Sequence, residues 1–258
     1  MSSEDVGAVA EGDAPEAPEE TARAGWRRPL HWFGRLTWWQ EGLLLVVLAV
    51  LIAALLKSFV VQTYSVAGPS MEPTLHDQER MLVKRFGGDP QRGDLVVFED
   101  PGGWLGEDEA DQGVVTSLLS ALGLYPTGGH LVKRVIGVEG DTIVCCTDDG
   151  LISVNGQPLE EDYLAELRPG AHCNGPMIST CDWSAGPVPA GKVFVMGDNR
   201  SNSDDSSYHL CRVDETDCTR DPYVDLDEIV GTVSAVAWPI SAWKRLHRPD
   251  VFDSIPEP

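Results

Sequence analysis

The sequence predicts a mainly antiparallel β protein with one N-terminal transmembrane helix. Two observations favour this fold class. A single uninterrupted apolar run, Leu43–Leu56, stands near the N-terminus, and beyond it short β-type segments alternate with Gly, Pro and Asp. No segment after the run sustains a long helical period, and the sequence contains no internal repeat. The 258 residues are enough for one sizeable domain or two small ones with tails.

The part before the apolar run has two sections of different charge. Residues 1–25 open with the acidic stretch MSSEDVGAVAEGDAPEAPEE and lack the large apolar side chains that build a core, so we expect a disordered tail. Residues 26–41 are basic and rich in Trp. Trp38 and Trp39 stand where an interfacial aromatic belt is expected, which predicts a juxtamembrane segment.

Residues 42–61 are predicted to form a transmembrane anchor. Alone, Leu43–Leu56 would also fit a buried core helix or a signal-peptide core. Extension through Phe59–Val61, with Lys57 reaching the interface, gives roughly the 20 residues that a bilayer requires. A cleaved signal peptide fits less well, because the run starts late and no A-x-A-type site follows it. Arginines precede the span, so the positive-inside rule places the tail in the cytoplasm and the rest of the chain outside.

The net charge and the cysteines limit the partners. A net charge of −22 argues against nucleic acid, because phosphate binding needs concentrated Lys and Arg. All 6 cysteines lie on the side predicted to be external, where an even number suggests disulfides. The adjacent Cys145 and Cys146 are expected to bond elsewhere rather than to each other. Because no C-x-x-C pair exists, we expect no metal, and no cofactor is indicated. The remaining cysteines are Cys173, Cys181, Cys211 and Cys218.

Short segments rich in β-branched residues supply the predicted strands. They are 80–86, 94–99, 130–138, 141–146, 192–197 and 229–238. Asn155-Gly156 carries the signal of a two-residue hairpin. We expect one extracytoplasmic β domain, one small cysteine-containing subdomain and a C-terminal tail. Their boundaries are 62–144 with 188–247, then 145–187, and 248–258.

Residues 99–129 are predicted to be an insertion in the β domain. They open as the acidic, Gly-rich loop EDPGGWLGEDEADQG and continue as VVTSLLSALGLYPTGG. Val114–Leu124 is expected to form a short apolar helix that packs on the sheet. Contact of this helix with a membrane surface is the alternative.

Ser70 stands in the stretch VAGPSMEPTL, where prolines on both sides fix the backbone and keep it out of a helix. Gly68 permits a backbone path that other residues resist. Such a serine is either a solvated loop residue or a nucleophile presented for attack. A Ser-His-Asp enzyme is not supported, because the histidines are scattered and no G-x-S-x-G motif exists. His76, close in sequence, is expected to face solvent.

Lys133 lies in the apolar strand LVKRVIGV, where alternation places it and Arg134 on opposite faces. Each face is otherwise apolar. A lysine in apolar surroundings loses hydration, which lowers its pKa, and a neutral amine can take the proton of a serine. The alternative is a strand lysine whose ammonium group reaches solvent.

The segment GDNRSNSDDS, residues 197–206, follows a predicted strand and reads as a loop of Asx turns. A calcium loop does not fit. Against the EF-hand pattern from Asp198, the third position is Arg200 and the twelfth is His209 in place of Glu.

Four motifs together resemble the type I bacterial signal peptidases. GPSMEPTL, RGDLVVF, KRVIGVEGD and GDNRSNSDDS occur in the order and strand context of that family, behind an N-terminal anchor. The resemblance spans about 60–100, 130–144 and 190–240, and it implies a signal-peptidase-type β fold with a Ser–Lys dyad. Ser70 would be the nucleophile that forms an acyl-enzyme, Lys133 the general base, and Ser203 the residue that orients Lys133. Asp198, Arg200 and Asp205 match positions that shape the neighbouring loop, and Arg134 matches a structural arginine.

Two positions depart from the family pattern. Many members carry a serine whose hydroxyl helps form the oxyanion hole where this chain has Gly68, so that side-chain donor is absent. The family often has Arg after the loop serine, and this chain has Ser207. A loop ion pair with Asp198 is therefore in doubt or is replaced, with Cys211 nearby as one substitute.

The resemblance implies a membrane-anchored serine endopeptidase that removes N-terminal signal peptides from exported preproteins. Its partners would be signal peptides and the lipid bilayer, with neither nucleic acid nor metal. It would lie in the bacterial cell membrane as a single-pass protein with a cytoplasmic N-terminus. Small residues at −1 and −3 of the substrate would enter pockets for which Met71, Val132 and Ile136 are candidates. The alternatives are a non-catalytic, membrane-tethered β domain that binds exported proteins, and a self-cleaving Ser–Lys protease.

Overall fold

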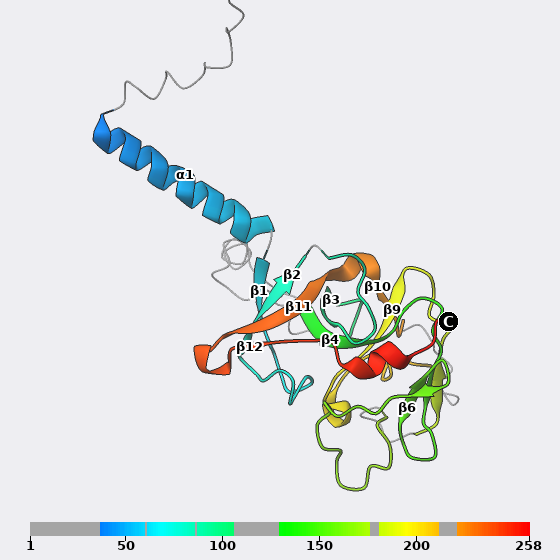
Figure 1. Cartoon of the computed structure of the whole chain (residues 1–258). Helices are drawn as coiled ribbons and strands as arrows, with labels where there is room; N and C mark the ends of the chain where they lie inside the picture. Colours follow the sequence, from blue (N-terminus) through cyan, green and yellow to red (C-terminus); the bar gives the residue numbers. More distant parts are fainter. Residues whose placement is uncertain (1–36, 60, 86, 106–128, 176–180, 212–220) are drawn as a thin grey trace, which may run out of the picture. The chain divides into compact units, whose positions relative to one another are not determined.

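The computed structural model describes most of the chain after residue 36 (Figure 1). The described ranges are 37–59, 61–85, 87–105, 129–175, 181–211 and 221–258. The predicted acidic tail, most of the juxtamembrane segment and the predicted helix Val114–Leu124 lie outside these ranges. The chain divides between Leu51 and Ile52 into two compact units, and each is described by itself.

The α-helix of the described ranges is α1, Trp38–Phe59, with 22 residues. Its start is capped, because the Thr37 N–H donates to Gln40 Oε1 at 2.9 Å. Leu, Val and Ala dominate the sequence, and the large apolar side chains from Leu43 to Ile52 are exposed. Among the helices that the structure describes, none combines the length and the apolar character needed to cross a membrane.

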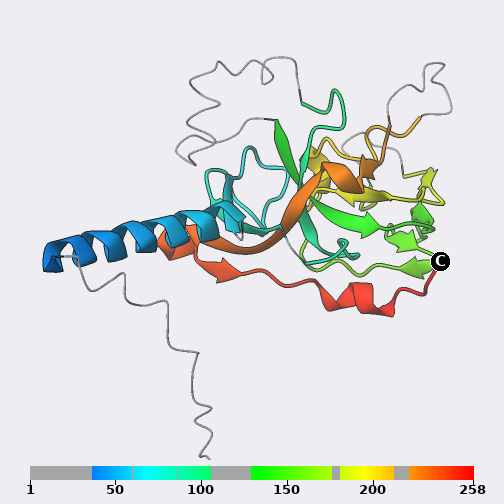
Figure 2. The same cartoon turned by 90° about the horizontal axis from the view of Figure 1, so that it is seen from above.

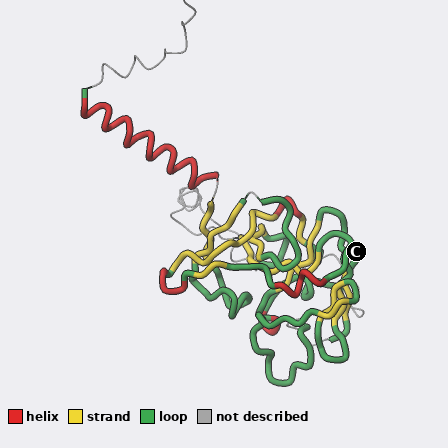
Figure 3. The backbone as a smooth tube through the Cα atoms, in the orientation of Figure 1, coloured by secondary structure: helices red, strands yellow, loops and turns green. Residues whose placement is uncertain are grey.

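The larger sheet is antiparallel throughout its described pairings, which confirms the mainly antiparallel β prediction (Figures 1 and 3). It has 8 strands in the order β1-β2-β11-β3-β4-β9-β10, and β12 pairs with β11. Their bounds are β1 Val61–Ser65, β2 Arg80–Lys84, β3 Leu95–Glu99, β4 His130–Gly137, β9 Lys192–Met196, β10 Val224–Asp225, β11 Ile229–Trp238 and β12 Lys244–Arg245. Short 3-10 helices lie between some of them, η3 Arg200–Asn202, η4 Leu226–Glu228 and η5 Ile240–Ala242, and a last one, η6 Asp250–Ser254, follows β12.

A 4-stranded sheet in the order β7-β6-β5-β8 forms the second layer of strands. Its strands are β5 Ile143–Cys145, β6 Ile152–Val154, β7 Gln157–Pro158 and β8 Trp183–Ala185. The predicted hairpin is confirmed: Asn155 and Gly156 join β6 to β7 with φ of 50° and 80°, the left-handed values that a tight two-residue turn needs. The C-terminal segment runs along the smaller sheet and ends beside the hairpin, where the Asn155 side-chain amide donates to the Pro256 carbonyl at 3.0 Å (Figure 2).

Strand β4 is the centre of the core, and its residues enter three apolar clusters. Val132 packs with Met71, Val135 with Phe98, and Ile136 with buried residues of the smaller sheet. Because β3 and β9 flank β4 and both of its faces are covered, Lys133 and Arg134 are each only 2% exposed. The fold therefore buries two basic side chains from adjacent sequence positions, so an ionised Arg134 needs a counter-charge and the charged form of Lys133 is disfavoured.

Candidate active site

The turn that follows β1 presents Ser70. Met71 is fully buried beneath it, and the Leu75 N–H donates to the Met71 carbonyl at 2.9 Å. The base of the turn is closed by Val66, whose N–H donates to the Glu79 carbonyl at 2.9 Å. Ser70 itself is half-buried. The prolines and the buried Met71 thus fix a rigid turn with its serine at the surface.

The loop after β9 holds the Ser70 turn directly. The Asn199 N–H donates to the Ser70 carbonyl at 3.0 Å, and its side-chain amide donates to the Pro69 carbonyl at 3.1 Å. Gly197 lies at the closest approach, because a Cβ placed there would collide with Ser203 Oγ and with the Ser70 carbonyl. The structure therefore brings the first and last sequence motifs into contact, and a glycine makes that contact possible.

Lys133 is buried, so the alternative of a lysine that reaches solvent does not fit. Burial lowers the pKa of its ammonium group, and three carboxylates oppose this shift. They belong to Asp205, Asp204 and Asp198. The amine is thus closer to neutrality than an ordinary lysine and faces the loop that carries these acids.

Ser203 is 1% exposed, and its hydroxyl donates to Asp205 Oδ2 at 2.5 Å. The same carboxylate oxygen accepts the Gly197 N–H at 3.0 Å. Its other oxygen accepts the backbone N–H and the hydroxyl of Ser207, at 3.1 and 2.6 Å. Asp205 is therefore saturated with four donors, and the Ser203 hydroxyl is fixed with its lone pairs free to accept.

Asp198 joins three of the sequence motifs. Arg134 binds it in a bidentate manner, with Nε to Oδ1 at 2.8 Å and Nη2 to Oδ2 at 2.6 Å. The Thr74 hydroxyl donates to Oδ2 at 2.5 Å. The ion pair of Asp198 was in doubt because Ser207 stands where the family often has Arg. Arg134 of strand β4 forms this ion pair, and Ser207 hydrogen-bonds to Asp205.

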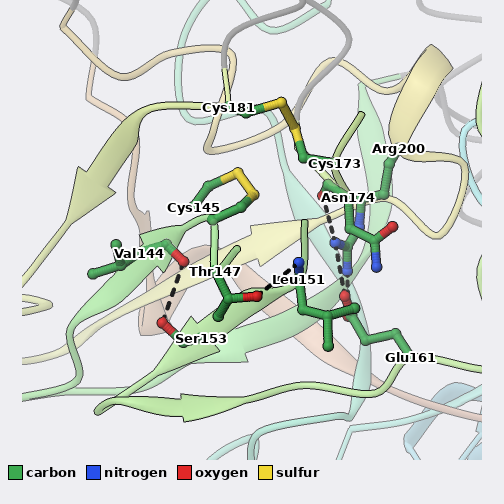
Figure 4. The surroundings of a disulfide bond; sticks show 11 residues. Val144, Cys145, Thr147, Leu151, Ser153, Glu161, Cys173, Asn174, Cys181 and Arg200 are labelled. Carbon is green, nitrogen blue, oxygen red and sulfur yellow. Dashed lines mark hydrogen bonds and ion pairs between the residues drawn. A yellow bond between two sulfur atoms is a disulfide. The ribbon is translucent and has the colours of Figure 1, made fainter. Parts of the chain in front are cut away.

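Arg200 links the loop after β9 to the segment between β7 and β8 (Figure 4). Its side chain and that of Glu161 are both 0% exposed, with Nη2 2.5 Å from Oε1. Arg200 Nε also donates to the Gly197 carbonyl at 2.9 Å, and Nη1 donates to the Asn174 carbonyl at 3.1 Å. Arg200 therefore fixes Gly197, the closest point of the loop to Ser70.

Four residues around the site were missed as partners by the sequence analysis: Glu161, Tyr163, Trp104 and His209. The Tyr163 hydroxyl donates a hydrogen bond to Glu161 Oε1 at 2.5 Å, and burial raises the pKa of Tyr163 well above its ordinary value. The Arg134 guanidinium lies 4.2 Å from the centre of the Tyr163 ring. His209 stacks on Trp104 with 4.6 Å between ring centres, and its Nε2 lies 2.6 Å from Asp204 Oδ1. No motif or spacing marks these residues, since irregular segments bring them in. His76 is exposed, as predicted.

Gly68 has a φ of 80°, a left-handed value that favours glycine, and a Cβ there would meet nothing within 4 Å. Its N–H donates to Asp77 Oδ1 at 3.2 Å. Of the pocket candidates, Met71 and Val132 share one cluster, whereas Ile136 packs in another. A separate cavity of about 540 Å³ is lined by residues such as Arg92 and Arg248 and does not include Ser70.

The cysteines differ from the expectation. Cys145 is bonded to Cys146 across a cis peptide bond, and Cys173 is bonded to Cys181 (Figure 4). The adjacent pair was expected to bond elsewhere, because a trans peptide separates neighbouring side chains in an extended strand. Cys145 ends strand β5, so the chain is free to leave the extended conformation at this bond.

Comparisons with known proteins agree with one family. The family model described as "Signal peptidase, peptidase S26" matches residues 39–238. Signal peptidase I of Mycobacterium tuberculosis (strain ATCC 25618 / H37Rv) is 35% identical over 257 residues, covering 92% of this chain and 82% of that protein. Signal peptidase I of Bacillus licheniformis is 36% identical over 173 residues, covering 66% of this chain and 78% of that protein. The crystal structure of a signal peptidase I from Enterococcus faecalis V583 matches 56% of this chain and 97% of that chain, with 24% identity and a TM-score of 0.36.

Proposed function

The chain belongs to the signal peptidase family S26 and is a peptidase, and on that premise we propose that it cuts signal peptides from exported preproteins with a Ser–Lys dyad. One observation carries the dyad. Lys133 is 2% exposed on β4, its pKa is lowered by burial, and it faces the loop that binds the Ser70 turn. A buried amine without a structural ion pair of its own in the described salt bridges is suited to act as a base.

In the proposed mechanism the neutral Lys133 amine removes the Ser70 hydroxyl proton as Ser70 attacks the scissile carbonyl. The acyl-enzyme forms, the new amine leaves with a proton from Lys133, and water then hydrolyses the ester. Ser203 orients the base. Because its hydroxyl donates to Asp205 at 2.5 Å, its oxygen can accept an N–H of Lys133 and aim the remaining lone pair of nitrogen at Ser70.

The oxyanion hole is proposed to rely on backbone donors. The Ser70 N–H remains available in this role, whereas Gly68 supplies no hydroxyl. Loss of one oxyanion donor elsewhere costs about 10²–10³ in kcat. The left-handed φ of Gly68 supports a turn adapted to glycine, in which a serine would be strained.

Substrate selection is proposed to favour small residues at −1 and −3. Met71 and Val132, which share an apolar cluster beside Ser70, are the proposed walls of a shallow pocket. Ile136 is proposed to support β4 from the other side, because it packs toward the smaller sheet.

Anchoring in the bacterial cell membrane is proposed for residues 42–61, with the N-terminus in the cytoplasm and the β domain outside. The support is the sequence: arginines precede the apolar run Leu43–Leu56, and Phe59–Val61 extend this run to roughly the length that a bilayer requires. An external β domain would also allow the disulfides to persist. An anchored enzyme would keep its dyad at the bilayer surface, where the apolar part of a signal peptide ends.

A cleavage assay tests the function. Purified full-length protein in detergent is mixed with a preprotein that has an A-x-A site, and the products are identified by mass. We expect wild type to cut after the second Ala, and Ser70→Ala and Lys133→Ala to cut at no more than the background rate. The matched controls are Ser65→Ala and Lys84→Ala, exposed residues of β1 and β2. Full activity in Ser70→Ala or in Lys133→Ala would rule out the dyad.

A further inference from the structure

Three cysteine sulfurs meet in the subdomain of the smaller sheet. The Sγ atoms of Cys145, Cys146 and Cys173 all lie within 4.8 Å of one another. They belong to two different disulfides, so two exchangeable S–S bonds stand side by side (Figure 4). Neither disulfide has a role in the proposed dyad.

Backbone hydrogen bonds hold the segments of the two disulfides together, although no S–S bond links one disulfide to the other. The Asn174 N–H donates to the Gly150 carbonyl at 2.8 Å, and the Gly150 N–H donates to the Thr147 carbonyl at 2.8 Å. A Cβ at Gly150 would collide with the His172 carbonyl, so only glycine allows this approach. These contacts hold the segment around Cys173 against the turn that follows Cys146 without involving the sulfur atoms.

We propose that Cys145, Cys146 and Cys173 form a thiol–disulfide exchange centre that reacts with external thiols through Cys181. The four sulfurs differ in exposure, and this sets the order of reaction. Cys181 is exposed, Cys173 and Cys146 are half-buried, and Cys145 is 3% exposed. An incoming thiolate reaches the most accessible sulfur first.

In the first step an external thiolate attacks Cys181 Sγ. A mixed disulfide forms between the external thiol and Cys181, and the Cys173–Cys181 bond breaks with its electron pair on Cys173. The Cys173 thiolate then attacks Cys145 Sγ, which breaks the Cys145–Cys146 bond and leaves the electron pair on Cys146. Cys146 takes up the proton that the external thiol lost. Two disulfides and one thiol are present before and after, so the sequence balances.

The direction of the second step follows from the leaving group. Attack at Cys145 expels the half-buried Cys146 thiolate, whereas attack at Cys146 would expel a thiolate at the buried Cys145. A thiolate keeps more of its hydration where water reaches it, so departure of the Cys146 thiolate is favoured. The product is therefore a Cys145–Cys173 disulfide with Cys146 free. An external dithiol would continue the reaction, because its second thiol releases Cys181 and leaves as a disulfide.

Two variants test the centre without any cleavage assay, so the result is independent of the proposed function. In Cys181→Ser the Cys173 thiol has no partner and can exchange. In the matched control, Cys173→Ser, the free thiol is Cys181, which is not part of the close group. Each full-length protein is purified without reductant, alkylated with iodoacetamide under denaturing conditions, digested and mapped by mass spectrometry.

We expect Cys181→Ser to contain a Cys145–Cys173 cross-link with the alkyl group on Cys146. The control should keep Cys145–Cys146 and carry the alkyl group on Cys181. Wild type treated with a monothiol should gain the mixed disulfide at Cys181 and an alkylated Cys146. An intact Cys145–Cys146 bond with alkylated Cys173 in Cys181→Ser would overturn the proposal, as would a first mixed disulfide at Cys145 or Cys146 in wild type.

Discussion

Replacing Asp198 with Ala removes the partner of a buried arginine. The side chains of Arg134 and Asp198 are 3% and 0% exposed, and their two contacts are 2.8 and 2.6 Å long. Removal of one partner leaves a guanidinium without its counter-charge in the interior, which typically costs about 3–5 kcal/mol of unfolding free energy. The lost hydrogen bond from Thr74 is part of the same change. We expect Asp198→Ala to lower the unfolding free energy by an amount in this range.

Urea unfolding of the full-length protein in detergent, followed by Trp fluorescence, measures this loss. The matched control is Asp221→Ala. Asp221 forms an ion pair of 2.9 Å with Lys192, but its side chain is 49% exposed, so its loss should cost about 0–1 kcal/mol. The double variant Arg134→Met/Asp198→Ala should be more stable than Asp198→Ala, because no unpaired cation remains buried.

The reasoning would be refuted if Asp198→Ala and Asp221→Ala lost equal stability. It would also fail if the double variant were less stable than Asp198→Ala. In either case Arg134 would not depend on Asp198, and the position of the loop against β4 would need another cause.

The other predictions concern Lys133 and two glycines. Because burial lowers the pKa of Lys133, kcat/KM should rise with pH as the amine loses its proton. The unfolding free energy should also rise with pH between that lowered pKa and about 10.4, since the unfolded chain binds one more proton than the folded chain in this range. Lys133→Met should remove this rise in unfolding free energy, which urea titrations at several pH values would measure. Gly197→Ala should reduce preprotein cleavage by about 10²-fold, because its Cβ displaces Ser203 and Ser70; a wild-type rate would contradict the close approach. Gly68→Ala should lower the unfolding free energy by about 1–2 kcal/mol, because φ at Gly68 is 80°. The control Gly191→Ala, where φ is 75°, should lower the unfolding free energy by a similar amount, but only Gly68→Ala should slow cleavage.

The sequence predicted the longer strands well for a physical reason. Segments such as 94–99 and 229–238 combine β-branched residues with Gly, Pro or Asp at their ends, and β3 and β11 occupy nearly the same residues. Strands β8, β10 and β12 have only two or three residues, too few for a periodic pattern. Strand β1 was missed because its first residue, Val61, is also the last residue of the predicted anchor.

The candidate site was predictable where residues stand in motifs. Ser70, Lys133 and Ser203 come from three motifs, and the structure shows that the loop of Ser203 binds the Ser70 turn. Glu161 was not predictable, because no motif in its own segment indicates that it pairs with Arg200, which is distant in sequence. The bond between Cys145 and Cys146 was mispredicted, since sequence alone does not reveal the turn of the chain at the end of β5.

The most direct test of the central claim asks whether Lys133 acts on the side chain at position 70. Ser70→Cys and Ser70→Cys/Lys133→Ala are alkylated with iodoacetamide over a range of pH, and the rate of labelling of the introduced thiol is measured by mass spectrometry. When the neutral Lys133 amine takes the proton of the introduced thiol, the resulting ammonium group stabilises the thiolate beside it. The labelling rate of Ser70→Cys should therefore rise at lower pH than that of the double variant. Coincident profiles would contradict the account, because Ser70 and Lys133 would then not act as one unit.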